Sequence, residues 1–269
     1  MRTKRSGTSG IGNYTIKALV STGASLRIYV IGRTSSEPRM QVFIQELHAI
    51  NPKADVIWIT GEISLLVETT RICSTIKTKE SRVDLLFLTA GYGPWGTGRR
   101  ETSEGIEITQ SLSYYSRVNS INLDDLDLRK SRNFTGMNAQ AQWAAMNTMA
   151  LEKLAIDHPH ITFIHSWPGW VDTGNVRRGQ EGSWSLWAWF VWLVLGPVLS
   201  IISFGEEKTG QRHLYQCTSP MFEEKEKNSV VLVNYRCEVT PNEEVMATLR
   251  QTAMNRVWEH TRDVLKPYL

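Results

Sequence analysis

Short apolar runs alternate along the chain with stretches that have helical spacing. The runs are rich in β-branched and aromatic side chains, which is typical of buried strands. They span residues 26–31, 56–60, 83–89, 161–165 and 230–234. The other segments predict helices over 11–21, 40–50, 65–79 and 138–155, and a last helix over 241–264. Buried strands separated by helices predict an α/β fold with a doubly wound parallel sheet, in a single domain over residues 1–269.

The composition is that of an ordinary globular protein. Of 269 residues, 41% are hydrophobic and 21% are charged, which excludes a disordered tail or a collagen-like repeat. The net charge of +3 is too small to indicate a nucleic-acid partner. The cysteines, Cys73, Cys217 and Cys237, are scattered, so we expect no disulfide framework and no metal site. Because the first residues also lack the apolar stretch of a secretory signal, we expect a cytoplasmic protein.

A glycine-rich turn, Ser6-Gly-Thr-Ser-Gly-Ile-Gly12, leads directly into the first predicted helix. Glycines allow a tight turn and a close approach of the backbone to a pyrophosphate, and the N–H groups of a helix N-terminus favour an anion. The turn therefore predicts a phosphate-binding loop, with a plain glycine-rich turn as the alternative. The candidate binding residues are Gly7, Thr8, Ser9, Gly10, Ile11 and Gly12.

This loop resembles the Thr-Gly-x-x-x-Gly-x-Gly motif of the short-chain dehydrogenase/reductase family. Three further motifs follow in the family's order. Leu88-Thr-Ala-Gly91 resembles its Asn-Asn-Ala-Gly, Leu151-Glu152 its Leu-Ala-x-Glu, and Pro168-Gly-Trp-Val-Asp-Thr173 its Pro-Gly-x-Val-x-Thr. Residues 101–105, 114–117 and 210–215 most resemble those of a fungal subset of this family. The resemblance implies a Rossmann-like sheet and a nicotinamide cofactor.

The resemblance also implies which residues border the cofactor. They are Ala90 and Gly91 after one strand and Pro168, Gly169, Val171 and Thr173 after another. At the end of the second strand of the family's order, Arg33 stands where a carboxylate would favour NAD. A guanidinium suits a 2′-phosphate, so we expect NADP rather than NAD, the alternative being a solvent-exposed arginine. Glu62 is a weaker candidate for an adenine contact.

The family's catalytic Tyr-x-x-x-Lys pair is absent. Counting back from Leu151-Glu152 places its two positions near Thr135 and Ala139, which carry no comparable acid or base. Tyr114 and Tyr115 are the remaining phenols that could serve, although core packing is the favoured interpretation for at least one of them.

Two strands of the family's fold also lack a counterpart. Only five residues, mostly polar, precede the glycine loop, and residues 119–133 contain no apolar run for a fifth strand. The first and fifth strands are therefore missing or degenerate. Three interpretations remain: a divergent enzyme using other groups, a homologue that binds cofactor or a partner without catalysis, or an incomplete gene product.

Residues 182–205 carry no charge and are rich in tryptophan. We expect 184–204 to form a lid or to contact a membrane surface, with a true membrane span and a buried helix as alternatives. Because such a lid would be apolar, it predicts a hydrophobic small-molecule substrate such as a polyketide or terpenoid. The sequence thus predicts an NADP-dependent oxidoreductase acting on a carbonyl or alcohol of a hydrophobic secondary metabolite.

Overall fold

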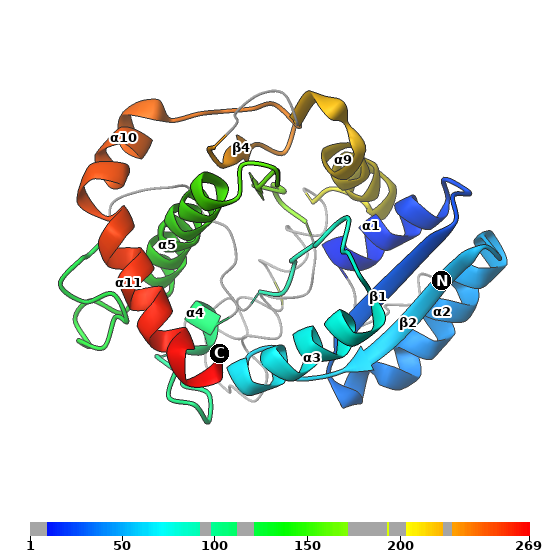
Figure 1. The fold of residues 1–269 in the computed structure, drawn as a ribbon, viewed down its shortest axis with the longest axis horizontal. Helices are drawn as coiled ribbons and strands as arrows, with labels where there is room; N and C mark the ends of the chain where they lie inside the picture. The colour runs from blue at the N-terminus through cyan, green and yellow to red at the C-terminus, as the bar shows by residue number, and fades with distance from the viewer. Residues whose placement is uncertain (1–9, 92–97, 112–120, 172–192, 194–202, 223–227) are drawn as a thin grey trace.

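The computed structural model describes residues 10–91, 98–111, 121–171, 193, 203–222 and 228–269. Its N-terminal part alternates helices and strands: α1 (Ile11–Val20), β1 (Leu26–Gly32), α2 (Glu37–Ile50), β2 (Ala54–Thr60) and α3 (Leu66–Lys79). The strands β1 and β2 are parallel, with Leu26 opposite Ala54 and Gly32 opposite Thr60. Figure 1 shows this pair on one side of the molecule, next to α2.

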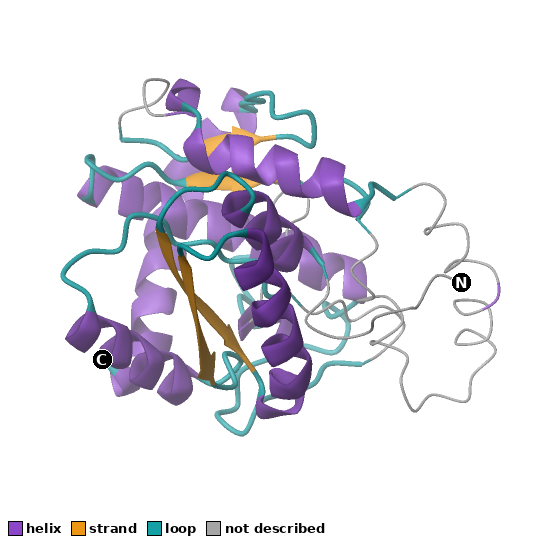
Figure 2. Ribbon diagram, turned by 90° about the vertical axis from the view of Figure 1, so that its right-hand side faces the viewer, coloured by secondary structure: helices purple, strands orange, loops and turns teal. Residues whose placement is uncertain are grey.

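A second parallel pair lies on the other side of the molecule. It consists of β3 (Ile164–Ser166) and β4 (Val231–Val233), and Figure 2 shows it separate from the first pair. The helices of this part are α5 (Gly136–Asp157), α9 (Glu206–Thr218), α10 (Glu243–Thr252) and α11 (Met254–Leu265). Shorter helical pieces are η1 (Thr34–Ser36), α4 (Ile108–Ser111), η3 (Pro220–Phe222) and η4 (Lys266–Tyr268).

Each strand pair has its own hydrophobic core. In the first, Val20 of α1 and Leu47 of α2 are fully buried with residues of β2. In the second, Trp143 and Met149 of α5 pack with β4, α10 and α11, and Val257 of α11 is 1% exposed. The apolar positions of the predicted helices therefore face the strands, as the helical spacing requires.

Helix α9 connects the two parts. It packs along α1, where a Cβ added at Gly210 would lie 2.5 Å from the carbonyl oxygen of Tyr14, so only glycine permits this approach. Lys17 Nζ of α1 is 3.0 Å from Glu206 Oε1 of α9. The α9 residue His213 also contacts the ring of Phe87 edge to face, with centroids 5.7 Å apart. Burial lowers the pKa of His213, which favours its neutral form at this contact.

The prediction of a strand over 83–89 is wrong for this structure. The segment has no regular secondary structure and belongs to neither parallel pair. Its side chains Val83, Leu85, Leu86 and Leu88 are 44–79% exposed. Full burial of one such side chain contributes about 1.5–3 kcal/mol to stability. Because these four side chains stay in water, the protein lacks a stabilisation that is large compared with the roughly 5–15 kcal/mol of a typical domain. The apolar run has the composition of a buried strand but lacks strand neighbours among the described residues.

The remaining elements follow the sequence closely. Strands were predicted at 26–31, 56–60 and 230–234, and β1, β2 and β4 lie there; β3 is shorter than its predicted range and begins at Ile164. The last helix divides at Ala253 (φ −121°, ψ −33°) into α10 and α11. The fold is α/β with small parallel sheets, a degenerate form of the predicted doubly wound Rossmann-like sheet.

Candidate cofactor site

The described residues of the predicted phosphate-binding loop, Gly10 to Gly12, lie at the N-terminus of α1. Gly10 caps the helix at φ 120° and ψ −161°, a backbone conformation that side chains other than glycine rarely adopt. The next residue, Ile11, is 5% exposed and anchors the helix in the core. The predicted residues Gly7, Thr8 and Ser9 lie outside the described residues.

The glycine loop meets the Leu88–Gly91 motif at one point. A Cβ at Gly12 would lie only 2.9 Å from the Thr89 hydroxyl oxygen. The structure therefore brings together two motifs that are far apart in sequence, as a shared cofactor site requires. Ala90 is exposed and Gly91 half-buried, immediately beyond this contact.

Arg33 and Glu62 lie side by side at the carboxyl ends of β1 and β2. The strand ends are held together by a hydrogen bond from the Gly61 N–H to the Gly32 carbonyl, 2.9 Å long. The Arg33 side chain is 63% exposed, and its Nε is 4.0 Å from Glu62 Oε2. A loose, exposed ion pair of this kind contributes little energy, so the guanidinium is free to turn toward a phosphate. The Glu62 carboxylate next to it accepts a hydrogen bond from the Ser64 hydroxyl at 2.8 Å, and its predicted adenine contact stays a prediction.

The Pro168–Gly169 turn follows β3 and is closely packed. Gly169 has φ +75°, and a Cβ there would lie 2.7 Å from Phe204 Cε2 and 2.9 Å from Tyr235 Cβ. Pro168 is buried, and Val171 forms a parallel bridge with Phe204. The turn therefore has a fixed shape, which suits a surface against a flat ring. Thr173 lies outside the described residues.

Sequence reasoning missed the aromatic support of this turn. Tyr235 stacks on Phe204 at 5.7 Å and contacts Trp167 edge to face at 5.5 Å. Because β3 and β4 are parallel neighbours, residues just beyond their ends meet at one edge of the sheet. The two predicted strands together could have placed Tyr235 beside Trp167, but nothing in the sequence signalled Phe204.

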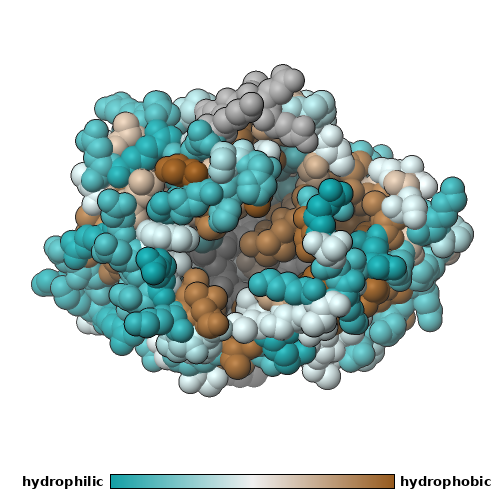
Figure 3. All heavy atoms as spheres, viewed as in Figure 1, coloured by the Kyte–Doolittle hydropathy of each residue, from teal (hydrophilic) through white to brown (hydrophobic). Residues whose placement is uncertain are grey.

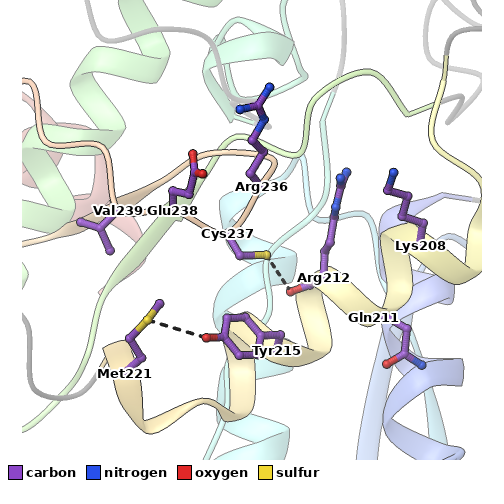
Figure 4. Close-up of a pocket in the computed structure, with 9 residues that line it drawn as sticks. All are labelled: Lys208, Gln211, Arg212, Tyr215, Met221, Arg236, Cys237, Glu238 and Val239. Atoms are coloured by element: carbon purple, nitrogen blue, oxygen red, sulfur yellow. Dashed lines mark hydrogen bonds between the residues drawn. The ribbon is translucent and has the colours of Figure 1, made fainter.

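A groove of about 730 Å³ lies between α9 and the loop after β4. Figure 4 shows Lys208, Arg212 and Arg236 extending in the same direction, and the Cys237 thiol donates a hydrogen bond to the Arg212 carbonyl oxygen at 3.6 Å. The Arg212 guanidinium lies 4.1 Å from the Phe204 ring centre, so one ring contacts both this groove and the Gly169 turn. The groove is lined by both apolar and polar side chains, with more cationic than anionic groups, and none of the predicted cofactor residues lines it.

The two positions that correspond to the family's catalytic pair have structural roles. Thr135 caps α5, and its hydroxyl accepts a hydrogen bond from the Asn138 N–H at 3.1 Å. Ala139 is completely buried. Neither position therefore carries a group that could transfer a proton. Tyr114 and Tyr115 lie outside the described residues, as does most of the predicted lid over 184–204. In the described part of the chain, no helix is both long and apolar enough to cross a membrane.

No protein-family model matches the chain. An oxidoreductase of Emericella nidulans is 29% identical over 96% of this chain and 90% of its own length. The oxidoreductase lepF of Aspergillus flavus is 29% identical over 97% of this chain and 90% of its own length. The short-chain dehydrogenase/reductase SAT2 of Stachybotrys chartarum is 33% identical, over 43% of this chain and 36% of its own length.

Solved structures share the fold. An NADPH-bound short-chain oxidoreductase of Pseudomonas aeruginosa with an atypical catalytic centre matches 87% of this chain and 95% of its own, with a TM-score of 0.55 and 17% identity. The chain therefore has the fold of the short-chain dehydrogenases/reductases. YwfH, an NADPH-dependent reductase involved in bacilysin biosynthesis, has the same fold. It matches 87% of this chain and 96% of its own length, with a TM-score of 0.55 and 16% identity.

Proposed function

We propose that the protein is a nicotinamide-dependent oxidoreductase that prefers NADP and acts on a carbonyl or alcohol of a hydrophobic secondary metabolite. The observation that carries the proposal is the contact between Gly12 and Thr89, which joins the predicted phosphate loop to the predicted cofactor-binding motif Leu88–Gly91. Oxidoreductases among its fungal relatives, which match it over most of both chains, support the reaction class.

The preference for NADP rests on Arg33. Its exposed guanidinium stands at the end of β1 with only a loose contact to Glu62, and paired N–H donors match a phosphate in geometry and charge. Two of the similar solved structures are of NADPH-bound or NADPH-dependent proteins, which agrees with this choice.

The hydrophobic substrate rests on the uncharged segment 184–204, which follows the Pro168–Gly169 turn in the chain. In this proposal the segment covers the substrate and excludes water from the nicotinamide. Contact of the same segment with a membrane surface is a second proposed role, because its tryptophans cluster near one end, as in interfacial anchors.

A second candidate function is cofactor binding without catalysis. It is favoured by Thr135 and Ala139, because one caps a helix and the other lies in the core. A positioned acid or base contributes roughly 10²–10⁴-fold to such reactions, so its loss removes most of the rate unless another group replaces it.

One experiment separates the two functions. The purified chain is saturated with NADPH, and oxidation of the cofactor is followed with a panel of apolar ketones and aldehydes. Turnover with stoichiometric product supports the oxidoreductase, and Tyr114→Phe and Tyr115→Phe then test the phenols as proton donors. Saturable NADPH binding without turnover on any substrate supports the binding protein.

A further inference from the structure

The groove between α9 and the loop after β4 is rich in positive charge. Lys208 and Arg212 stand one turn apart on α9, so both side chains lie on one face of the helix. Arg236 comes from the loop after β4, and Figure 4 shows the three side chains extending in the same direction. Among the described residues that line the groove, Glu238 is the one carboxylate. Three cations therefore share the groove with a single anion.

The positive charge is not neutralised within the described part of the chain. The Glu238 carboxylate accepts a hydrogen bond from Asn234 Nδ2 at 2.9 Å and forms no ion pair with the three cations. Arg212 and Lys208 contact the Phe204 ring instead, at 4.1 Å and 5.2 Å from its centre. The Arg212 Nη1 atom is buried and has no hydrogen-bond partner, which is an unfavourable state for a donor. An anion in the groove would supply both the missing charge and the missing acceptor.

The other end of the groove is largely apolar. Figure 4 shows Met221 and Val239 there, away from Lys208. Tyr215 lies beside Met221, and its side chain is open to a ligand because the residue is 44% exposed. It follows Lys208 by seven residues on α9, which is about 10 Å along a helix with a rise of 1.5 Å per residue. The groove therefore suits a molecule with an anionic head and an apolar body of about this length.

We propose that this groove is a binding site for an amphipathic oxyanion, either a carboxylate or a phosphate ester. The head group contacts Lys208 and Arg212, where the guanidinium offers paired N–H donors and the ammonium a point charge. The apolar body lies along Tyr215 and Met221. Because none of the predicted cofactor residues lines the groove, the inference does not depend on the cofactor or on the reaction.

A series of four probes tests the head and the body separately by isothermal titration calorimetry of the full chain. Octanoate and octyl phosphate carry both parts, acetate lacks the apolar body, and 1-octanol lacks the charge. The neutral probe is needed because an apolar tail alone would also find other surfaces: Figure 3 shows apolar side chains around a hollow at the centre of the face seen in Figure 1. Acetate and 1-octanol should bind more weakly than the better of the two amphipathic anions by roughly tenfold or more.

Three variants locate the binding in the groove. Lys208→Gln and Arg212→Gln should each weaken binding of the better anion by roughly tenfold, and Lys208 is an exposed residue whose replacement leaves the core intact. The matched control is Lys77→Gln, which removes an exposed cation of α3 and should leave the affinity unchanged. Lys208→Gln should also leave the affinity for NADPH unchanged, which separates this site from the predicted cofactor site.

The tighter of the two anions identifies the head group, and saturable binding of either supports the proposal when the groove variants weaken it. Equal affinity for 1-octanol and octanoate would overturn the proposal, as would equal affinities in all three variants or no saturable binding of either anion. Sedimentation adds one further outcome. Self-association of the chain that Arg212→Gln and Lys208→Gln abolish would assign the groove to a second copy and contradict a small-molecule site.

Discussion

Gly12 and Thr89 touch across the candidate cofactor site, so closely that a single methyl group at Gly12 would lie 2.9 Å from the threonine hydroxyl. The contact brings the two motifs together, and it leaves no room for a side chain at position 12. The substitution Gly12→Ala should therefore displace the Leu88–Gly91 motif and weaken NADPH binding by roughly 5–150-fold, the equivalent of an overpacking cost of about 1–3 kcal/mol.

A double variant tests whether this contact is the cause. Thr89→Ala removes the hydroxyl that the new methyl group would meet, so Gly12→Ala combined with Thr89→Ala should bind NADPH more tightly than Gly12→Ala alone. Fluorescence titration of all four proteins gives the coupling between the two positions. Additive losses would show that Gly12 acts independently of Thr89.

Arg33 and Glu62 should have opposite effects on cofactor choice. Arg33→Asp should weaken the binding of NADPH more than the binding of NADH, because only NADPH presents a 2′-phosphate to the guanidinium. Glu62→Gln should strengthen the binding of NADPH relative to that of NADH, because it removes a negative charge 4.0 Å from Arg33 Nε. The measurement is the ratio of the two dissociation constants for each variant; equal losses for both cofactors would exclude Arg33 from phosphate recognition.

Gly169 should be required for stability through its contacts as well as its backbone. Gly169→Ala introduces a Cβ within 3 Å of Phe204 and Tyr235, whereas Gly23 shares the same φ of +75° in open space. Gly169→Ala should therefore lower the free energy of unfolding by about 1–3 kcal/mol more than Gly23→Ala. Denaturant unfolding of both variants measures the difference, and equal losses would assign the whole effect to the backbone conformation.

His165 should make stability depend on pH. It lies on β3 with its Nδ1 2.8 Å from the Thr148 hydroxyl oxygen, and burial lowers its pKa to about 4, compared with about 6.5 in an unfolded chain. Between these values the unfolded chain binds a proton that the native protein excludes. The contribution is therefore complete above about pH 6.5 and is lost as the pH falls to about 4, a change of roughly 3 kcal/mol.

The variant His165→Gln keeps a polar side chain but removes the titration. Its free energy of unfolding should change less steeply with pH between 6.5 and 4 than that of the original chain. Denaturant curves at several pH values measure both slopes. An unchanged slope would mean that other groups cause the pH dependence.

The sequence predicted local structure well because periodic apolar faces and glycine turns act within a few residues. The helix that begins at Ile11 and the strand that ends at Gly32 follow from such patterns, and so does the position of Arg33 beyond that strand. The exposed run from Val83 to Leu88 could not be predicted, because an apolar segment becomes a strand only when neighbours hydrogen-bond to it. Phe204 was missed for a similar reason: its contact with Gly169 depends on tertiary packing.

The central claim is that residues 10–12, Arg33 and the Thr89–Gly91 motif form a working nicotinamide cofactor site. Titration of the purified full chain with NADPH, followed by fluorescence of the reduced nicotinamide, tests it most directly. The account predicts saturable binding that Gly12→Ala weakens and that 2′-phosphate-bearing competitors displace more effectively than their unphosphorylated counterparts. Absence of saturable binding of both NADPH and NADH by a protein that unfolds cooperatively would contradict it.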